Sequence, residues 1–143
     1  MAEKQISANL ASQNGSMGNR SHQKILIVDD EQDIRMIIRL VLEKYNFSVI
    51  EAGNGKKALE LLEKDTNKEI ICVITDYLMP QMNGLQLCQY LRANYKHLNS
   101  IFLITAYLDK DQFEKTTCFD EKFMKPLDFE DLVRKLRNHV HCN

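Results

Sequence analysis

Short apolar runs alternate with segments of helical periodicity from Lys24 onward, and this alternation restricts the possible folds more than any other feature. The apolar runs are Ile25–Val28, Phe47–Ile50, Ile70–Ile74 and Ile101–Ile104, and a fifth strand is expected within Phe119–Met124. Runs of four or five residues without polar alternation are typical of parallel strands that are covered on both faces. Five such strands separated by helices predict an α/β fold, a doubly wound parallel sheet with five helices.

The segments between the runs have the spacing of amphipathic helices. In the first of them, Ile34, Ile37, Ile38 and Val41 recur at i, i+3, i+4 and i+7, so all four are expected on the core face. The apolar positions of the other clear helices are Ala58, Leu61 and Leu62, then Leu85, Cys88 and Leu91, and finally Phe129, Leu132, Val133, Leu136 and Val140, with Asp128 as a cap. Residues 109–117 predict a weak helix, because Phe113 is almost its only apolar anchor.

Charge and hydropathy exclude several classes of partner. The formal net charge is −1, and no concentrated basic surface is available for phosphate backbones, so no direct nucleic-acid contact is expected. The longest apolar runs fall far short of the ~18 residues that a membrane span requires. No membrane insertion is expected.

Two further features bear on organisation and compartment. Residues 1–23 are rich in Ser, Asn and Gln and lack apolar periodicity, which predicts a flexible N-terminal tail before a single domain at 24–143. The four cysteines, Cys72, Cys88, Cys118 and Cys142, show no C-x-x-C spacing. Cys72 and Cys88 lie among apolar residues as small core residues do, so a reduced, cytoplasmic protein is expected.

Polar side chains follow the strands where a doubly wound sheet places its ligand site. Asp29, Asp30 and Glu31 follow the first run, Asp76 the third, Thr105 the fourth, and Lys125-Pro126 the fifth. Two unit charges ~4 Å apart repel by ~4 kcal/mol at an effective dielectric near 20, so clustered carboxylates need a counter-charge. A hard divalent cation with oxygen ligands, Mg²⁺ above all, would supply it together with Lys125.

Each piece alone has an ordinary structural explanation, such as a helix cap or a turn, but their coincidence at four strand ends is specific. The pieces are Ile25–Glu31, Thr75–Gly84, Leu103–Ala106 and Phe123–Pro126. In this order and spacing they resemble bacterial two-component response-regulator receiver domains of the single-domain, chemotaxis-receiver type. The resemblance covers essentially all of residues 24–143 and implies a flavodoxin-like fold with strand order 2-1-3-4-5.

The resemblance also implies a function and a set of site residues. Asp76 would take a phosphoryl group from a histidine kinase or histidine phosphotransferase. Asp29, Asp30, Asp76 and the main-chain carbonyl of Leu78 would hold Mg²⁺, with Mn²⁺ as an alternative ion. Thr105 and Lys125 would contact the phosphoryl group. The protein would catalyse only its own phosphorylation and dephosphorylation, and is otherwise not an enzyme.

Further expectations follow from the same family. A downstream protein would bind residues 108–125 and the last helix, and the Lys125-Pro126 peptide is expected to be cis. Leu78 and Tyr107 would tune the lifetime of the phosphoryl group. Because the last helix ends close to Asn143, the chain is either a single-domain receiver or an excised part of a longer protein.

One position departs from the family pattern. Receivers usually carry Tyr or Phe three residues before the site lysine, where this chain has Lys122. Lys122 is most simply interpreted as a solvated charge and Phe123 as a core residue. Switching would then depend on Thr105 and residues 109–117 without an aromatic flip.

Two other functions remain open at this point. A receiver-like docking module that is never phosphorylated would keep the fold, although all five polar site residues are present. A flavin-binding or hydrolytic α/β enzyme is disfavoured, because no glycine-rich phosphate loop follows the first run.

Overall fold

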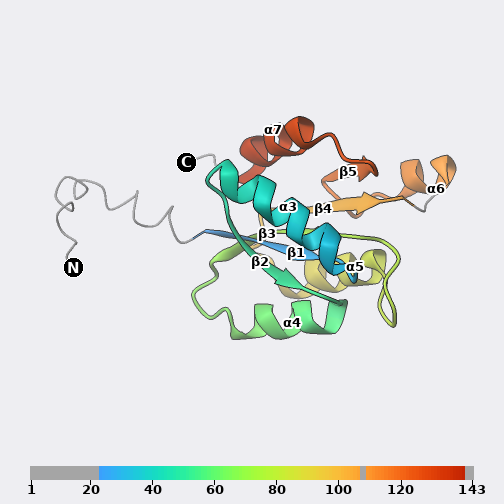
Figure 1. The fold of residues 1–143 in the computed structure, drawn as a ribbon. Helices are drawn as coiled ribbons and strands as arrows, with labels where there is room; N and C mark the ends of the chain where they lie inside the picture. Colours follow the sequence, from blue (N-terminus) through green and yellow to red (C-terminus); the bar gives the residue numbers. More distant parts are fainter. Residues whose placement is uncertain (1–22, 107–108, 141–143) are drawn as a thin grey trace.

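The computed structural model describes residues 23–106 and 109–140, and Figure 1 shows a central sheet with helices on both faces. The strands are β1 (Lys24–Val28), β2 (Ser48–Ala52), β3 (Ile70–Thr75), β4 (Ser100–Thr105) and β5 (Glu121–Met124). The helices of the described residues are α3 (Gln32–Lys44), α4 (Gly55–Lys64), α5 (Gly84–Asn94), α6 (Lys110–Lys115) and α7 (Phe129–Val140). All pairings are parallel in the order β2-β1-β3-β4-β5, which confirms the predicted doubly wound fold.

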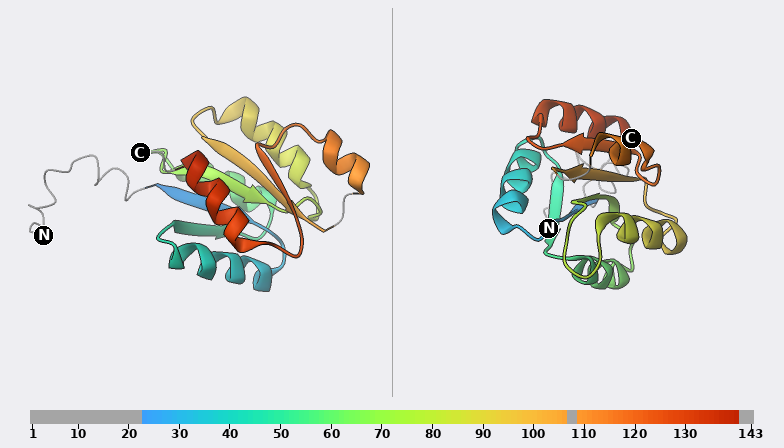
Figure 2. Two further views of the ribbon diagram at one scale, coloured as in Figure 1. Left: turned by 90° about the horizontal axis from the view of Figure 1, so that it is seen from above. Right: turned by 90° about the vertical axis from the view of Figure 1, so that its right-hand side faces the viewer.

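Two apolar layers hold the sheet, one on each face. On one face α3 and α7 contribute Ile38, Leu42 and Leu136, among others, to the core. On the other face α4 and α5 bury Leu62 and Leu87. Figure 2 shows the same division, with α3 and α7 on one side of the strands and α4 and α5 on the other. The central strands are covered on both sides, as runs without polar alternation predict.

The core face of α3 differs from the prediction at one position. Ile38 and Leu42 are buried, and Ile34 and Val41 are partly buried, but Ile37 is 46% exposed. The buried stripe follows i and i+4 through Leu42 and leaves Ile37 beside it. Ile37 therefore joins Met36 and Leu40 in an exposed apolar patch on α3.

Helices α6 and α7 agree with their sequence signals. Helix α6 is only six residues long and buries none of its side chains, although Phe113 packs partly against the core. At α7, the Asp128 carboxylate accepts a hydrogen bond from the Asp131 amide at 3.1 Å, so the predicted cap is confirmed. The Lys125-Pro126 peptide is cis, as expected.

The N-terminal tail predicted for residues 1–23 lies, except for Gln23, outside the described residues. Strand β1 begins at Lys24, where the predicted domain begins. Within residues 23–106 and 109–140, no helix has the length and apolar character needed to cross a membrane.

Candidate functional site

The sheet register brings the predicted site residues to one edge. Val28 at the end of β1 lies opposite Thr75 at the end of β3, so Asp29 and Asp76 leave the sheet side by side. The Asp76 amide donates to the Val28 carbonyl at 3.0 Å and extends this pairing by one residue. Asp30 follows directly, and ligand oxygens of all three carboxylates lie within 4.8 Å of one another.

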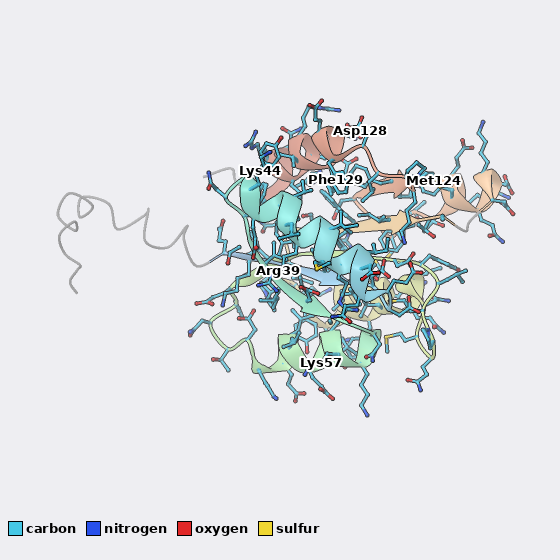
Figure 3. All side chains as sticks on the ribbon, in the orientation of Figure 1. Arg39, Lys44, Lys57, Met124, Asp128 and Phe129 are labelled. Carbon is cyan, nitrogen blue, oxygen red and sulfur yellow. A yellow bond between two sulfur atoms is a disulfide. The ribbon has the colours of Figure 1, made fainter. Side chains whose placement is uncertain are left out.

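Lys125 enters the same edge from β5. Its amide donates to the Thr105 carbonyl at 3.0 Å, which extends the pairing of β4 with β5. Its Nζ lies 3.3 Å from Asp29 Oδ2 and 3.5 Å from Asp76 Oδ2. In Figure 3, Met124, the residue before Lys125, marks this end of β5. The described fold thus joins one ammonium group to carboxylates from two other strands.

Main-chain amides fix the orientation of the two buried carboxylates. Asp29 Oδ1 accepts from the Glu31 amide at 2.9 Å, and Asp76 Oδ1 accepts from the Tyr77 amide at 2.8 Å. In both residues the other oxygen, Oδ2, faces Lys125. This arrangement presents one oxygen of each carboxylate to a common point.

The site is short of positive charge. Three carboxylates with one lysine leave a net charge of −2 among groups of which Asp29 and Asp76 are buried. Burial and the neighbouring Asp29 raise the pKa of Asp76, although Lys125 and the Tyr77 amide lower it in part. Burial lowers the pKa of Lys125, but Asp29 and Asp76 more than reverse this, so its pKa is raised overall.

The donor set fits a Mg²⁺ ion. Around an octahedral Mg²⁺ with bonds of ~2.1 Å, two ligand oxygens lie about 3.0 Å apart when adjacent and about 4.2 Å apart when opposite. The three carboxylate oxygens, which lie within 4.8 Å of one another, therefore have to move closer together by small side-chain rotations to bind one ion. Its charge of +2 would offset the net charge of −2 that remains when Lys125 is counted with the three carboxylates. Asp29, Asp30 and Asp76 are therefore able to hold the ion; the position of the Leu78 carbonyl stays a prediction.

The raised pKa of Asp76 predicts a pH-dependent instability without metal. The folded protein holds this proton more tightly than the unfolded chain, so stability falls as pH rises from about 4 through the raised pKa. In EDTA at pH 7, Asp76→Asn is expected to melt at a higher temperature than the wild type. The difference should shrink near pH 3.5 and on addition of Mg²⁺. Asp111→Asn, which removes an exposed carboxylate on α6, is the control; equal melting of Asp76→Asn and wild type at pH 7 would contradict the prediction.

Thr105 and Leu78 occupy different surroundings. Thr105 is fully buried at the end of β4, adjacent to Lys125 in the pairing of β4 with β5. Leu78, two residues beyond Asp76 in the sequence, is 48% exposed. Tyr107, expected to act with Leu78, lies outside the described residues.

Gly84 makes the closest backbone contact of the site. Its amide donates to the Tyr77 carbonyl at 2.8 Å, and a Cβ at this position would lie 2.2 Å from the Asp76 carbonyl oxygen. Asn83, the residue before Gly84, caps α5: its side-chain oxygen accepts a hydrogen bond from the Gln86 amide at 2.8 Å. The side-chain oxygen of Gln86 in turn accepts one from the Asn83 amide. Helix α5 can therefore begin against Asp76 only because residue 84 has no side chain.

Arg35 supports the site and was not predicted from the sequence. Its Nη1 donates to the Asp29 carbonyl oxygen at 2.7 Å, and its Nε pairs with Glu51 Oε1 at 3.0 Å. Arg39, labelled in Figure 3, binds the other oxygen of Glu51 at 3.0 Å. These two guanidinium groups lower the pKa of Glu51 against its desolvation by burial. The only sequence signal was the spacing of two arginines one helical turn apart.

Lys122 is not a solvated charge, so that prediction was wrong. Its Nζ donates to the main-chain oxygens of Phe113 at 2.7 Å and Thr116 at 2.8 Å, and it lies over the Phe113 ring at 5.4 Å from the centroid. The carbonyls at a helix C-terminus attract cations because they lack partners within the helix. Lys122 therefore ties the C-terminus of α6 to β5. Phe123 is buried in the core, as predicted.

Removing the Lys122 ammonium is expected to loosen α6. A hydrogen bond to a charged group contributes ~1.5–3 kcal/mol, and α6 has no buried side chain to compensate for the loss. Lys122→Met should raise amide exchange at residues 110–115 by about tenfold or more. Lys115→Met, at an exposed lysine of the same helix that pairs only with Asp111 among the described contacts, is the control. If amide exchange at residues 110–115 were unchanged in Lys122→Met, α6 would have to be held by contacts other than Lys122.

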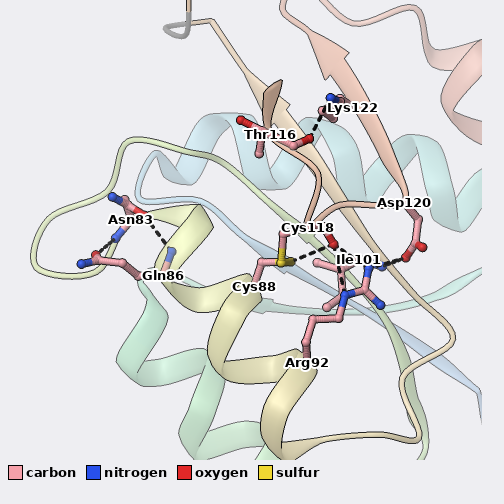
Figure 4. The surroundings of a disulfide bond; sticks show 9 residues. All are labelled: Asn83, Gln86, Cys88, Arg92, Ile101, Thr116, Cys118, Asp120 and Lys122. Atoms are coloured by element: carbon pink, nitrogen blue, oxygen red, sulfur yellow. Dashed lines mark hydrogen bonds and ion pairs between the residues drawn. A yellow bond between two sulfur atoms is a disulfide. The ribbon is translucent and has the colours of Figure 1, made fainter. Parts of the chain in front are cut away.

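The cysteines also differ from the prediction. Cys88 of α5 and Cys118, 30 residues later, form a disulfide, with their Cα atoms 6.4 Å apart (Figure 4). Their sequence spacing carried no signal, because the pairing depends on how α5 packs beside the segment before β5. Cys72 is a free, buried thiol whose pKa is raised by burial to about 12, which agrees with its predicted core position. Cys142 lies outside the described residues.

Comparisons with known families agree on where this chain belongs. Residues 25–137 match the family model described as the response regulator receiver domain. The response regulator ArlR of Staphylococcus saprophyticus is 34% identical over 118 residues, which cover 80% of this chain and 50% of ArlR. The transcriptional regulatory protein SrrA of Staphylococcus aureus is 30% identical over 118 residues, covering 80% of this chain and 46% of SrrA. The chain thus spans about half the length of these curated relatives.

Solved structures agree. A response regulator receiver domain protein from Clostridium thermocellum superposes with a TM-score of 0.73 and 25% identity, over 83% of this chain and 94% of that one. The response regulator TrrA from Thermotoga maritima, in complex with Mg²⁺ and BeF, has a TM-score of 0.68 and 30% identity, over 81% of this chain and 97% of that one. The residues matched by the family model, 25–137, include the carboxylates and Lys125.

Proposed function

Because the chain belongs to the response regulator receiver domain family, we propose that Asp76 accepts a phosphoryl group and that Asp29, Asp30, Thr105 and Lys125 assist the transfer. The observation that carries this assignment is the meeting of three carboxylates with one lysine at a single sheet edge. Asp29 and Asp76 both adjoin the carboxylate cluster and Lys125; Asp76 is assigned as the acceptor because it follows the third strand, where receiver domains carry the phosphoacceptor. Its Oδ1 is held by the Tyr77 amide, and its Oδ2 faces the shared point.

In the proposed reaction, an Asp76 oxygen forms a bond to phosphorus while the phosphorus–nitrogen bond of a phosphohistidine breaks. The departing imidazole takes the electron pair and a proton from water. A carboxylate is a weak nucleophile toward a charged phosphoryl group, so the chain contributes mainly position and charge. Lys125 pairs with one phosphoryl oxygen, and the Thr105 hydroxyl donates to another. In this proposal the chain catalyses only its own phosphorylation and dephosphorylation at Asp76.

We propose Mg²⁺ as the ion held by Asp29, Asp30, Asp76 and the Leu78 carbonyl, with Mn²⁺ able to replace it. The bound ion supplies positive charge to the phosphoryl oxygens during transfer. The structure of TrrA with Mg²⁺ and BeF supports this choice by analogy. Asp29, buried and oriented by the Glu31 amide, fixes one ligand, while the exposed Asp30 remains free to adjust.

Two surfaces are proposed to bind partner proteins, one for the phosphodonor and one for the downstream target. The phosphodonor would be a histidine kinase or histidine phosphotransferase, and it would bind the exposed Met36, Ile37 and Leu40 of α3, the helix that follows Asp30. The downstream target would bind residues 108–125 and α7. Helix α6 supports this second surface, because all its side chains are at least partly exposed.

The direct test is a mass measurement. Incubation with Mg²⁺ and a small phosphodonor is expected to add ~80 Da to the wild type and nothing to Asp76→Asn. Asp111→Asn, with the same charge change on α6, should gain the mass as the wild type does. A wild type that gains no mass with Mg²⁺ would favour the non-phosphorylated docking module instead.

A further inference from the structure

The segment between α6 and β5, residues 116–120, is held by contacts with α5 and β4. Arg92 of α5 donates from Nη2 and Nε to the Cys118 carbonyl oxygen at 2.7 and 3.1 Å. The same Nη2 pairs with Asp120 Oδ2 at 2.9 Å, and that oxygen also accepts from the Ile101 amide at 2.8 Å. Figure 4 shows these contacts converging around the Cys88–Cys118 disulfide. The only covalent contact among them is the disulfide.

We propose that Cys88 and Cys118 form a reversible redox site, at which a low-molecular-weight thiol–disulfide couple such as glutathione makes and breaks a covalent link between α5 and this segment. Their Cα separation of 6.4 Å lies within the range that a disulfide spans without backbone movement. The two sulfurs also differ in access, because Cys88 is fully buried whereas Cys118 is partly exposed.

This difference in access sets the order of the chemistry. A glutathione thiolate attacks Cys118 Sγ, the disulfide breaks, and Cys88 leaves as a thiolate that takes up a proton. A second glutathione thiolate then attacks the glutathione sulfur of the mixed disulfide and frees Cys118, which also takes up a proton. One protein disulfide is reduced by two electrons and two thiols become one glutathione disulfide. Oxidation of the protein is the same sequence in reverse.

The reduced protein keeps its fold but loses its covalent clamp. Cys88 Sγ lies 3.3 Å from the Cys118 carbonyl oxygen, within reach of a hydrogen bond from the reduced thiol. The Arg92 contacts remain, and Lys122 still holds the end of α6 at the Phe113 and Thr116 carbonyls. What changes is the freedom of the segment to move away from α5.

The clamp joins two elements that frame the phosphoryl site. Helix α5 starts at Gly84, which touches the main chain of Asp76, and Cys88 lies one turn farther along the helix. Residues 116–120 lead into β5, which ends next to Lys125. The redox proposal does not depend on phosphorylation, because its site and its chemistry are separate from Asp76.

The test uses the full chain equilibrated in glutathione buffers of different reduced-to-oxidised ratio, alkylated after unfolding, and weighed intact. We expect four alkylated thiols in the reduced limit and two in the oxidised limit, with peptide mapping placing the lost pair at Cys88 and Cys118. Cys142→Ser, the matched control, should go from three thiols to one. Cys118→Ser should keep three thiols throughout. Four thiols at every ratio, or a pair that includes Cys72 or Cys142, would overturn the proposal.

A second measurement tests the clamp itself. Oxidation is expected to raise the melting temperature of the wild type by about 10 °C and to slow amide exchange at residues 116–120 by at least about tenfold. Neither change should occur in Cys118→Ser or in Cys88→Ala, so the result does not depend on one variant folding. Equal exchange in oxidised and reduced wild type would mean that the bond forms without clamping the segment, and would refute this part of the proposal.

Discussion

Replacing Gly84 with alanine is expected to destabilise the protein by about 3 kcal/mol and to impair phosphorylation at the same time. The added Cβ would lie 2.2 Å from the Asp76 carbonyl oxygen and 3.1 Å from the Tyr77 Cα, both main-chain atoms that cannot move aside as a side chain would. The start of α5 or the strand end at Asp76 must shift. Urea unfolding measures the stability, and mass gain with Mg²⁺ and a phosphodonor measures the site.

Gly53→Ala is the matched control for this substitution. Its Cβ would meet only the Arg35 guanidinium, at 3.4 and 3.9 Å, which is ordinary van der Waals contact with a flexible side chain. We expect its stability to stay within ~1 kcal/mol of the wild type. If Gly84→Ala unfolded at the same urea concentration as Gly53→Ala, the contact of α5 with Asp76 would be looser than described.

Replacing Lys125 with glutamine is expected to slow phosphorylation of Asp76 by about 10²–10³-fold, the usual loss when one preorganised donor is removed from a charged transition state. Lys125 is the cation that contacts both buried carboxylates in the described structure. Without it, the attack of Asp76 on a negatively charged phosphoryl group would proceed beside Asp29 with one positive charge fewer. The initial rate of the ~80 Da mass gain at saturating Mg²⁺ is the measurement.

Lys135→Gln separates this local effect from the change in net charge. Lys135 pairs with Glu121 at 3.0 Å on the α7 face, so its loss removes the same charge away from the site. Its phosphorylation rate should stay within about twofold of the wild type. A Lys125→Gln variant that matched Lys135→Gln would remove the lysine from the proposed mechanism.

The sheet and the strand-end residues could be predicted because their signals are local. An uninterrupted apolar run such as Ile70–Ile74 reports burial on both faces directly, and parallel strands place the residues that follow them at one edge. Asp29, Asp76 and Lys125 therefore met as expected, although Lys125 is 96 residues from Asp29 in the sequence. The Asp128 cap was predictable for the same reason, because its carboxylate binds an amide three residues later.

The features that were missed depend on packing between distant elements. Whether Lys122 of β5 points to solvent depends on where α6 ends. The three carbonyl oxygens that its ammonium group contacts belong to the C-terminal end of α6 and the residue after it. The pairing of Cys88 with Cys118 depends on the position of α5. Ile37 had the spacing of a core residue, but the width of the α3 contact, and not its period, decided its exposure. The periodicity of apolar residues predicts which face of a helix is turned toward the core. It does not predict how much of that face a neighbouring element covers.

The span between Asp29 and Lys125 has a consequence for protein synthesis. Strands β1 and β3 supply the clustered carboxylates early in translation, whereas their ammonium partner belongs to the last strand. A nascent chain that ends before residue 125 lacks the lysine that contacts both buried carboxylates, so the site as described forms only after β5 has been synthesised.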